Sequence, residues 1–425
     1  MVDADPRPID LEPRSRRARG IAGLLRVYPS LESWEFRLLW MGTLQSMVAW
    51  QMSVVASGYA ALVISGSATM LGVVSSAVGL PLLLSPIGGV AADRFSRRTI
   101  LLISQTTMGL GAVALAVLSI AGLLEVWHLV ALGLIQGLAF AFNAPARQAY
   151  LGQVVPMRLM RNAVALNNAA TNFCRVGGPA LAGILLSVPG LGISGVFVVM
   201  GVLYVCVLLT LVRLPADHPD PAERRAGGFD QLKEGMRYIT SSPTLVTLLA
   251  MNLISVLFGM PYLALLPLFS ERVFEVGPAG LGALTAASGL GALVGSLMVA
   301  AFSDYSRPAI LKIGLGVGLG ASLILVALSP MFVIALVFLA AAGFASAAYT
   351  SLNNTLIMGN TEQRMYGRVM SVYVLSFALM PVGALPMAWL AEQVGGRLAF
   401  GIAGSLTAGA ILAVAIFHPS IRKIR

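Results

Sequence analysis

The amino-acid sequence predicts an all-α protein that crosses a lipid bilayer with twelve helices, arranged as two six-helix halves. Hydrophobic residues make up 57% of the 425 residues and charged residues 11%, whereas roughly a quarter of a soluble protein is charged. The charges leave long uncharged runs, which are too long and too uniform for the alternating strands of a membrane barrel. A hydrophilic stretch near the middle divides these runs into two sets. A soluble enzyme, a nucleic-acid-binding domain and a disordered scaffold are therefore excluded.

The intervals without Asp, Glu, Lys or Arg mark the spans, because a helix needs about 20 apolar residues to cross the hydrocarbon. Three intervals are long enough for two passes, and each has a turn signal near its middle, at Ser65–Ser67, Pro189–Gly192 and Ser329–Pro330. The others provide one pass each. The intervals are 38–92, 99–124, 126–146, 162–212 (interrupted by Arg175), 238–270, 276–303, 313–361, 369–391 and 398–421.

These spans predict a domain plan. The halves are 38–212 and 243–418, joined by a cytoplasmic connector at 213–242 and flanked by cytoplasmic tails at 1–37 and 419–425. In the connector, Phe229, Leu232, Met236 and Ile239 recur at helical spacing, which predicts a short amphipathic helix on the membrane surface. A second interfacial helix is expected at Gly20–Tyr28.

The distribution of positive charge predicts the orientation. With both termini in the cytoplasm, only Arg272 and Arg397 of the 28 Lys and Arg fall in outer loops, and Arg175 lies inside a span. This bias is typical of a multi-pass protein of the cell (inner) membrane. The net charge of +10 then needs no nucleic-acid partner, and the cluster Arg14–Arg19 is interpreted as a tail near anionic lipid.

A weak internal repeat relates the two halves. The second span of the first half ends in Gly88–Arg98, and the corresponding span of the second half ends in Phe302–Arg307. The loops Pro156–Asn162 and Thr361–Gly367 also correspond in length and charge. Repeated six-helix halves around a central cavity are typical of transporters, whereas a channel is more often a symmetric oligomer of a short chain.

The chain resembles the major facilitator superfamily over essentially its whole length, and two motifs carry this resemblance. Gly89–Arg98 resembles its loop motif, glycine-x-x-x-aspartate-arginine-x-glycine-arginine-arginine, with Ser96 at the second glycine. Gly178–Gly183 resembles the glycine-proline signature of exporters and antiporters, with Ala182 replacing one glycine and Cys174 at the leading one.

More narrowly, the chain is similar to the branch of enterobactin exporters and macrolide efflux proteins, the transmembrane secretion effectors. The resemblance implies export of a small amphiphilic or anionic organic compound, such as a drug or siderophore, by alternating access, with protons as the coupling ion. Gly133 stands where drug–proton antiporters commonly have an arginine, so their coupling scheme does not transfer directly. The stretches that carry the similarity are Trp50–Met52, Asn143–Gln148, Asn162–Asn167 and Glu234–Tyr238.

The loop motif predicts a conformational latch. Asp93, at the inner end of span two, is expected to meet the positive end of span eleven and Arg364 or Arg368 when the inner side is closed. Asp304 is expected to do the same for span five, through Arg147 or Arg161. The alternative interpretations are that Asp93 only balances neighbouring arginines and that the small residues of span five only pack. The remaining gating candidates are Gly89, Arg94, Arg97, Arg98, Gly178 and Pro179.

Arg175 is the candidate for substrate binding, because it lies near the middle of span five. A charge there costs at least about 2.5–3.5 kcal/mol, and no Asp or Glu lies deep in any span. Arg175 therefore needs either Asn168, Asn172 and helix carbonyls, or an anion that enters the cavity. The aromatic candidates for an amphipathic pocket, each equally compatible with plain packing, are Trp50, Tyr59, Phe258, Tyr262, Tyr373 and Phe377.

No catalytic or cofactor constellation is present in the sequence. The three histidines lie near span ends or in the connector, both cysteines lie in apolar runs, and no phosphate-binding loop precedes a Lys-Ser or Lys-Thr pair. We expect no enzyme activity, metal or cofactor, and a monomer whose partners are the bilayer, a small-molecule substrate and protons. The alternatives are an uncoupled facilitator or importer and, more remotely, a non-transporting membrane partner or sensor.

Overall fold

The computed structural model describes residues 29–216, 228–301 and 308–417. The expected interfacial helix at Gly20–Tyr28, the cluster Arg14–Arg19, the last cytoplasmic tail and Asp304 lie outside these residues. All regular secondary structure in the described part is helical, which confirms the all-α class.

The helices follow the chain in two sets of spans. The first half contains η1 (Pro29–Glu32), α2 (Trp34–Ser65), α3 (Ala68–Gly79), η2 (Leu80–Leu84), α4 (Ser85–Arg94), α5 (Arg97–Ile120), α6 (Val126–Val154), η3 (Met157–Leu159), α7 (Met160–Ser187) and α8 (Gly192–Val212). The connector contains α9 (Gly228–Ser241). The second half contains α10 (Pro243–Ile254), η5 (Ser255–Gly259), α11 (Tyr262–Leu268), η6 (Phe269–Val273), α12 (Gly277–Ala301), α13 (Pro308–Leu328), α14 (Phe332–Gly359), η7 (Gln363–Met365), α15 (Tyr366–Phe377), α16 (Met380–Val394) and α17 (Gly396–Phe417).

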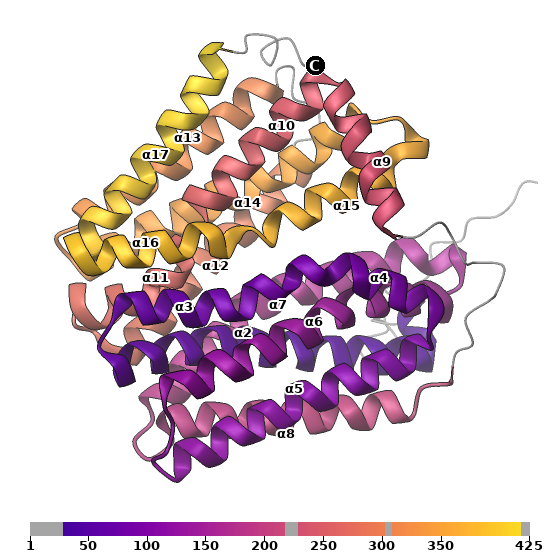
Figure 1. The fold of residues 1–425 in the computed structure, drawn as a ribbon, viewed down its shortest axis with the longest axis horizontal. Helices are drawn as coiled ribbons and strands as arrows, with labels where there is room; N and C mark the ends of the chain where they lie inside the picture. The colour runs from indigo at the N-terminus through magenta and orange to yellow at the C-terminus, as the bar shows by residue number, and fades with distance from the viewer. Residues whose placement is uncertain (1–28, 217–227, 302–307, 418–425) are drawn as a thin grey trace, which may run out of the picture.

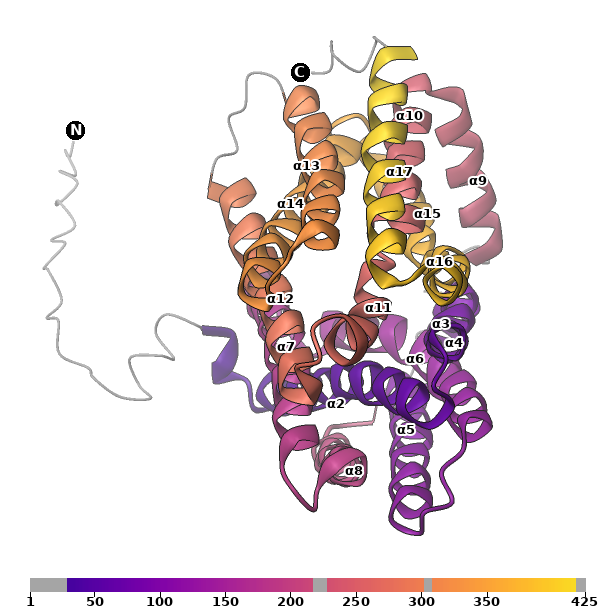
Figure 2. The same cartoon turned by 90° about the vertical axis from the view of Figure 1, so that its left-hand side faces the viewer.

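Eleven helical segments of the described chain are long and apolar enough to cross a membrane. The fifth span, α7, is not among them, although it is a helix of 28 residues. The reason is its composition: Asn162, Asn167, Asn168, Asn172 and Arg175 make α7 less apolar than the other spans. It is nevertheless packed between α2 and α12 in the bundle (Figure 2).

Local signals explain where spans begin and break. Ser67 and Ser96 cap α3 and α5, their hydroxyls accepting from the backbone N–H of Met70 and Thr99. Gly66 ends α2 with φ of 64°, a conformation that glycine adopts without steric cost. Spans two, seven and eleven are each interrupted by 3-10 or π turns or bends near a proline, because proline removes a backbone donor.

The two halves meet at one end of the molecule and separate at the other (Figure 1). Near the end that carries Glu392, α3 packs against α16 and α7 against α12, and both pairs lie side by side in Figure 2. At the opposite end, α4 and α15 diverge in Figure 1. We call these the Glu392 end and the arginine-rich end, the second after Arg94, Arg97, Arg364 and Arg368.

The buried apolar clusters have the same asymmetry. The largest cluster contains residues of both halves, among them Ala49, Leu71, Leu265 and Ala388. Toward the arginine-rich end, one cluster belongs to the first half, around Leu211, and others belong to the second half and the connector. The halves therefore share one core where they touch and keep separate cores where they diverge.

Polar contacts join the halves at the Glu392 end. The carboxylate of Glu392 accepts from the Ser67 hydroxyl and the Thr69 N–H, both at 3.0 Å. The guanidinium of Arg272 donates to the carbonyl of Gly66. Deeper in the bundle, a Cβ on Gly183 would lie 2.5 Å from the Gly282 Cα of α12. The glycines of span five thus allow close approach to the other half.

Glycine packing within the second half provides a stability test. A Cβ on Gly343 of α14 would lie 1.9 Å from the Ser288 carbonyl oxygen of α12, whereas a Cβ on Gly318 of α13 would have no atom within 4 Å. We expect Gly343→Ala to lower the free energy of unfolding by about 1–3 kcal/mol through overpacking. Gly318→Ala, the matched control, should leave it unchanged or slightly higher. Thermal unfolding of the purified protein measures both, and equal midpoints for the two variants would contradict the packing.

Candidate functional site

Arg175 lies on α7, where the two halves face one another. Its side chain is exposed, although the surrounding protein partly desolvates the guanidinium. It is within electrostatic range of the Tyr262 hydroxyl on α11, which belongs to the other half and hydrogen-bonds the Ser288 hydroxyl at 2.7 Å. In the described part of the chain, Arg175 forms no hydrogen bond or ion pair. An accessible, uncompensated cation therefore lies between the halves.

The asparagines expected to clamp Arg175 do not do so here. Asn168 is exposed and Asn172 half-buried on the same helix. Neither amide hydrogen-bonds Arg175 or any other described residue in this conformation. Both asparagines remain beside Arg175 in the helix, so the polar surface of α7 is available to a ligand or to water.

The aromatic candidates separate into different environments. Trp50 stacks on Phe140, with ring centroids 4.1 Å apart. Tyr59 lies near the carboxylate of Glu271, at the junction with the other half. Tyr373 and Phe377 meet edge to face at 5.3 Å, and Phe258 is half-buried on η5. Of this set, the structure relates only Tyr262 to Arg175.

Arg147, which the sequence predicts as a partner of Asp304, is buried rather than at the surface. It lies within α6, with 6% of its surface exposed. Its Nη1 donates to the Thr43 hydroxyl at 3.0 Å and its Nε to the Asn143 Oδ1 at 3.4 Å. Nη2 is buried and has no hydrogen-bond partner among the described residues. All the contacts of the guanidinium within the described chain are thus with the interior of its own half.

Lys312 is a second buried cation, and sequence reasoning missed it. Because α13 begins at Pro308, Lys312 is a helical residue rather than a loop residue, and it is fully buried. Its ammonium donates to the Asn353 side chain and to the Leu248 carbonyl, and lies 5.3 Å from the centre of the Tyr349 ring. The signals for it were Pro308 as a helix start and the adjacent asparagines Asn353 and Asn354 in the apolar run of α14.

A chain of amides extends from Lys312 toward the other side of its half. The Asn353 Nδ2 donates to the Asn252 Oδ1 at 3.4 Å, and the Asn252 Nδ2 donates to the Ser376 hydroxyl at 2.7 Å. In the first half, the Asn143 Nδ2 donates in turn to the Ser104 hydroxyl at 2.8 Å. Both networks join the first, third and fourth spans of their half. Each contains one cation and no carboxylate.

The loop motif of the first half is anchored within that half. Arg98 donates to the carbonyls of Leu211 and Val212 at the end of α8, at 3.1 and 2.6 Å. Arg97 donates to the Gln153 side chain at 3.3 Å. Asp93 and Arg94 are exposed, and Asp93 forms no hydrogen bond or ion pair with the described residues. A Cβ on Gly89 would meet nothing within 4 Å, so there is open space beside this position of α4.

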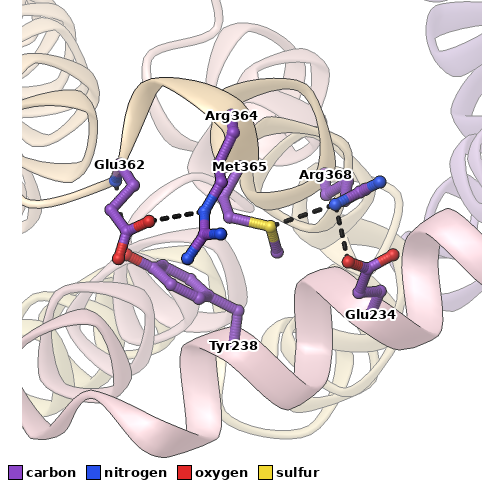
Figure 3. A network of polar contacts seen from close by, with 6 residues as sticks. All are labelled: Glu234, Tyr238, Glu362, Arg364, Met365 and Arg368. Carbon is purple, nitrogen blue, oxygen red and sulfur yellow. Dashed lines mark hydrogen bonds and ion pairs between the residues drawn. The ribbon is translucent and has the colours of Figure 1, made fainter.

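The arginines expected to meet Asp93 have other partners, which Figure 3 shows. Arg368, on α15, forms an ion pair with Glu234 of the connector helix α9 at 2.6 Å. Arg364 forms one with Glu362, also at 2.6 Å. The backbone of α9 lies against α15, because a Cβ on Gly235 would be 2.5 Å from the Arg368 carbonyl oxygen. The connector thus holds Arg368, one of the two arginines predicted to meet Asp93.

These features define a class of protein. Two helical halves that share a core at one end only, with an accessible cation between them, are the architecture of a membrane transporter in which the halves move relative to each other. The fold agrees with solved structures. The nucleoside transporter NupG superposes with a TM-score of 0.70 at 12% identity, covering 92% of this chain and 100% of that one. A bacterial homolog of the human lysosomal transporter Spinster, in an inward-facing and unoccupied conformation, has a TM-score of 0.66 at 16% identity, covering 92% and 95%.

The chain belongs to the transmembrane secretion effector family, which matches residues 27–423. Its similar relatives are transporters and not enzymes. Macrolide efflux protein A of Streptococcus pyogenes is 25% identical, over 92% of this chain and 96% of the relative. The multidrug efflux pump Tap of Mycolicibacterium fortuitum is 27% identical, over 88% and 92%. The enterobactin exporter EntS of Shigella flexneri is 27% identical, over 67% and 66%. The protein is therefore a multi-pass transporter of the major facilitator type.

The Glu234–Arg368 ion pair is testable as a conformational bias. It is partly exposed, so its contribution is about 0.2–1 kcal/mol. We expect Glu234→Gln to free Arg368 and to favour closure of the arginine-rich end by about 1.4- to 5-fold in population. Distances between spin labels at the arginine-rich ends of α4 and α15 measure this. The shift should vanish when Asp93→Asn is added, because the released Arg368 is expected to pair with Asp93. A shift that persists in the double variant would contradict this pairing.

Proposed function

We propose that the protein is a secondary transporter that exports a small amphiphilic or anionic organic compound by alternating access. The observation that carries this proposal is Arg175, an accessible guanidinium without a protein partner in the space between the halves. An anion that enters this space would compensate the charge. The export direction draws on the similar relatives, which are named as efflux proteins or exporters.

The orientation follows from the positive-inside rule. If the arginine-rich end faces the cytoplasm, the present conformation is open inward and closed at the Glu392 end. Closing the arginine-rich end would bring Asp93 to α15, where Arg368 would exchange Glu234 for Asp93. Opening of the Glu392 end would break the contacts of Glu392 with Ser67 and Thr69. A compound bound at Arg175 would then be released outside.

Protons are the coupling ion in this proposal, and Lys312 is their carrier. The carboxylates that the sequence offers are all at span ends, whereas Lys312, one turn inside α13, is fully buried. An ammonium can lose its charge by releasing a proton, but a guanidinium stays charged. Tyr349 and Tyr373 are the titratable groups that α14 and α15 bring near it. α10 has none, and the one charged residue of α17, Arg397, binds the far end of α13.

The uncoupled facilitator remains the second candidate. It is favoured by one observation, the lack of any carboxylate in the polar networks of Arg147 and Lys312. Flux that ignores a pH gradient would support it. A non-transporting partner or sensor would show no substrate-dependent flux.

Transport of matched dyes tests the proposed function. In proteoliposomes, we expect counterflow of the anion carboxyfluorescein to exceed that of the cation ethidium. Arg175→Gln should reduce carboxyfluorescein counterflow about 10- to 100-fold, because it removes a hydrogen bond to a charged group worth about 1.5–3 kcal/mol. Arg158→Gln, at an exposed loop arginine, is the control and should transport normally. Normal carboxyfluorescein transport by the Arg175 variant would exclude the anion site.

Proton coupling through Lys312 is tested separately. We expect Lys312→Gln and Lys312→Arg to retain counterflow but to lose accumulation driven by an imposed pH gradient, since neither side chain can exchange a proton near neutral pH. Lys233→Gln, on the exposed face of α9, should accumulate the dye like the wild type. Gradient-driven accumulation that survives in Lys312→Gln would assign the proton to another group.

A further inference from the structure

A cavity lies inside the first half, between α2, α6 and α7. Its volume is about 180 Å³, which is room for several non-hydrogen atoms, since one water needs about 10–15 Å³ on this measure. It is on the arginine-rich side of Arg175. The lining residues are Phe36, Leu39, Trp40, Thr43, Met47, Ala144, Arg147, Gln148, Leu151, Asn167 and Thr171.

The cavity contains a cation with an unused donor. Arg147 lines it, is nine-tenths buried, and keeps Nη2 without a hydrogen-bond partner among the described residues. No acidic residue lines the cavity. A buried charge that lacks both a counter-charge and part of its hydrogen bonding is costly. An anionic group in the cavity would supply both.

The rest of the lining suits an amphiphile. Asn167, Thr171 and Gln148 add polar side chains, and Trp40, Phe36 and Met47 add apolar surface. The Trp40 indole is held in place by donating to the Leu166 carbonyl at 3.2 Å. A guanidinium presents its donors in one plane, which matches the two oxygens of a carboxylate or phosphate.

The cavity also has a defined position relative to Arg175. Asn167, Thr171 and Arg175 are spaced four residues apart on α7, so they lie on successive turns of one side of the helix. Two arginines therefore border the same stretch of α7, with Arg147 one or two turns nearer to the arginine-rich end.

We propose that this cavity is a binding subsite for the carboxylate or phosphate group of an amphiphile. Arg147 and the neighbouring Thr43 hold the anionic group, and the apolar part of the ligand packs against Trp40. The subsite rests on the proposed function in one respect: in a transporter open at the arginine-rich end, this is where an anionic substrate first meets a buried cation. The site is distinct from Arg175. The same chemistry is supplied by two sources, a soluble anion or the headgroup of an anionic lipid.

Equilibrium binding of radiolabelled salicylate to the full-length protein in phosphatidylcholine nanodiscs tests the subsite. We expect saturable binding of salicylate and at least tenfold weaker binding of the neutral analogue salicylamide. Arg147→Gln should weaken salicylate binding at least tenfold. Lys233→Gln, on the exposed face of α9, is the control and should not change it. Thr171→Leu fills the cavity without touching the guanidinium and should also weaken binding, which covers the case in which the Arg147 variant fails to fold.

Phosphatidylglycerol nanodiscs distinguish the two sources. Competition by this lipid that disappears in Arg147→Gln assigns the site to a lipid headgroup, and Arg147-dependent salicylate binding in both lipids assigns it to a soluble anion. Salicylate binding that is unchanged in Arg147→Gln and Thr171→Leu, or equal binding of salicylamide, overturns the subsite. If dye counterflow still depends on Arg175 in that case, the proposed function stands and only this inference fails.

Discussion

Cations without carboxylates are the constraint on which this transporter depends. Arg147, Arg175 and Lys312 all lie within spans, where an unpaired charge is costly. Arg147 and Lys312 obtain hydrogen bonds from hydroxyls, amides and carbonyls, which satisfy part of their donor capacity without neutralising their charge. Arg175 has not even these partners in the described chain. The described interior of each half therefore contains a cation without a counter-charge, and this is the basis of the proposal that the substrate is an anion.

The asymmetry between the two ends follows from how the helices pack. Small residues let α7 approach α12 and α3 approach α16, and the polar contacts of Glu392 complete the closure. At the other end, each half buries its own apolar cluster, so the halves separate without exposing a shared core. The connector helix α9 contributes by holding Arg368 on the second half. The moving surface is thus polar and small, which suits a reversible contact.

The sequence predicted the fold class, the family and the turns between spans, because charge, proline and glycine act locally. It placed Arg175 correctly inside a span. It also placed Arg147 at a surface latch, whereas the structure buries it against Thr43. Lys312 was counted with the loop charges, since a charge one turn inside a helix looks the same in sequence as one just outside it. Its burial depends on Asn353 and Tyr349, which are some 40 residues away.

By itself, the sequence determined that this chain is an all-α protein with spans long enough to cross a lipid bilayer, because hydrophobic length and the placement of charge are properties of each segment alone. Only the tertiary structure decided which end of the bundle is closed, which partner Arg368 takes, and that Arg147 borders a cavity. These depend on side chains brought together from helices far apart in the chain. The role of a buried cation depends on the side chains that surround it in space, and the sequence does not give the distances between them.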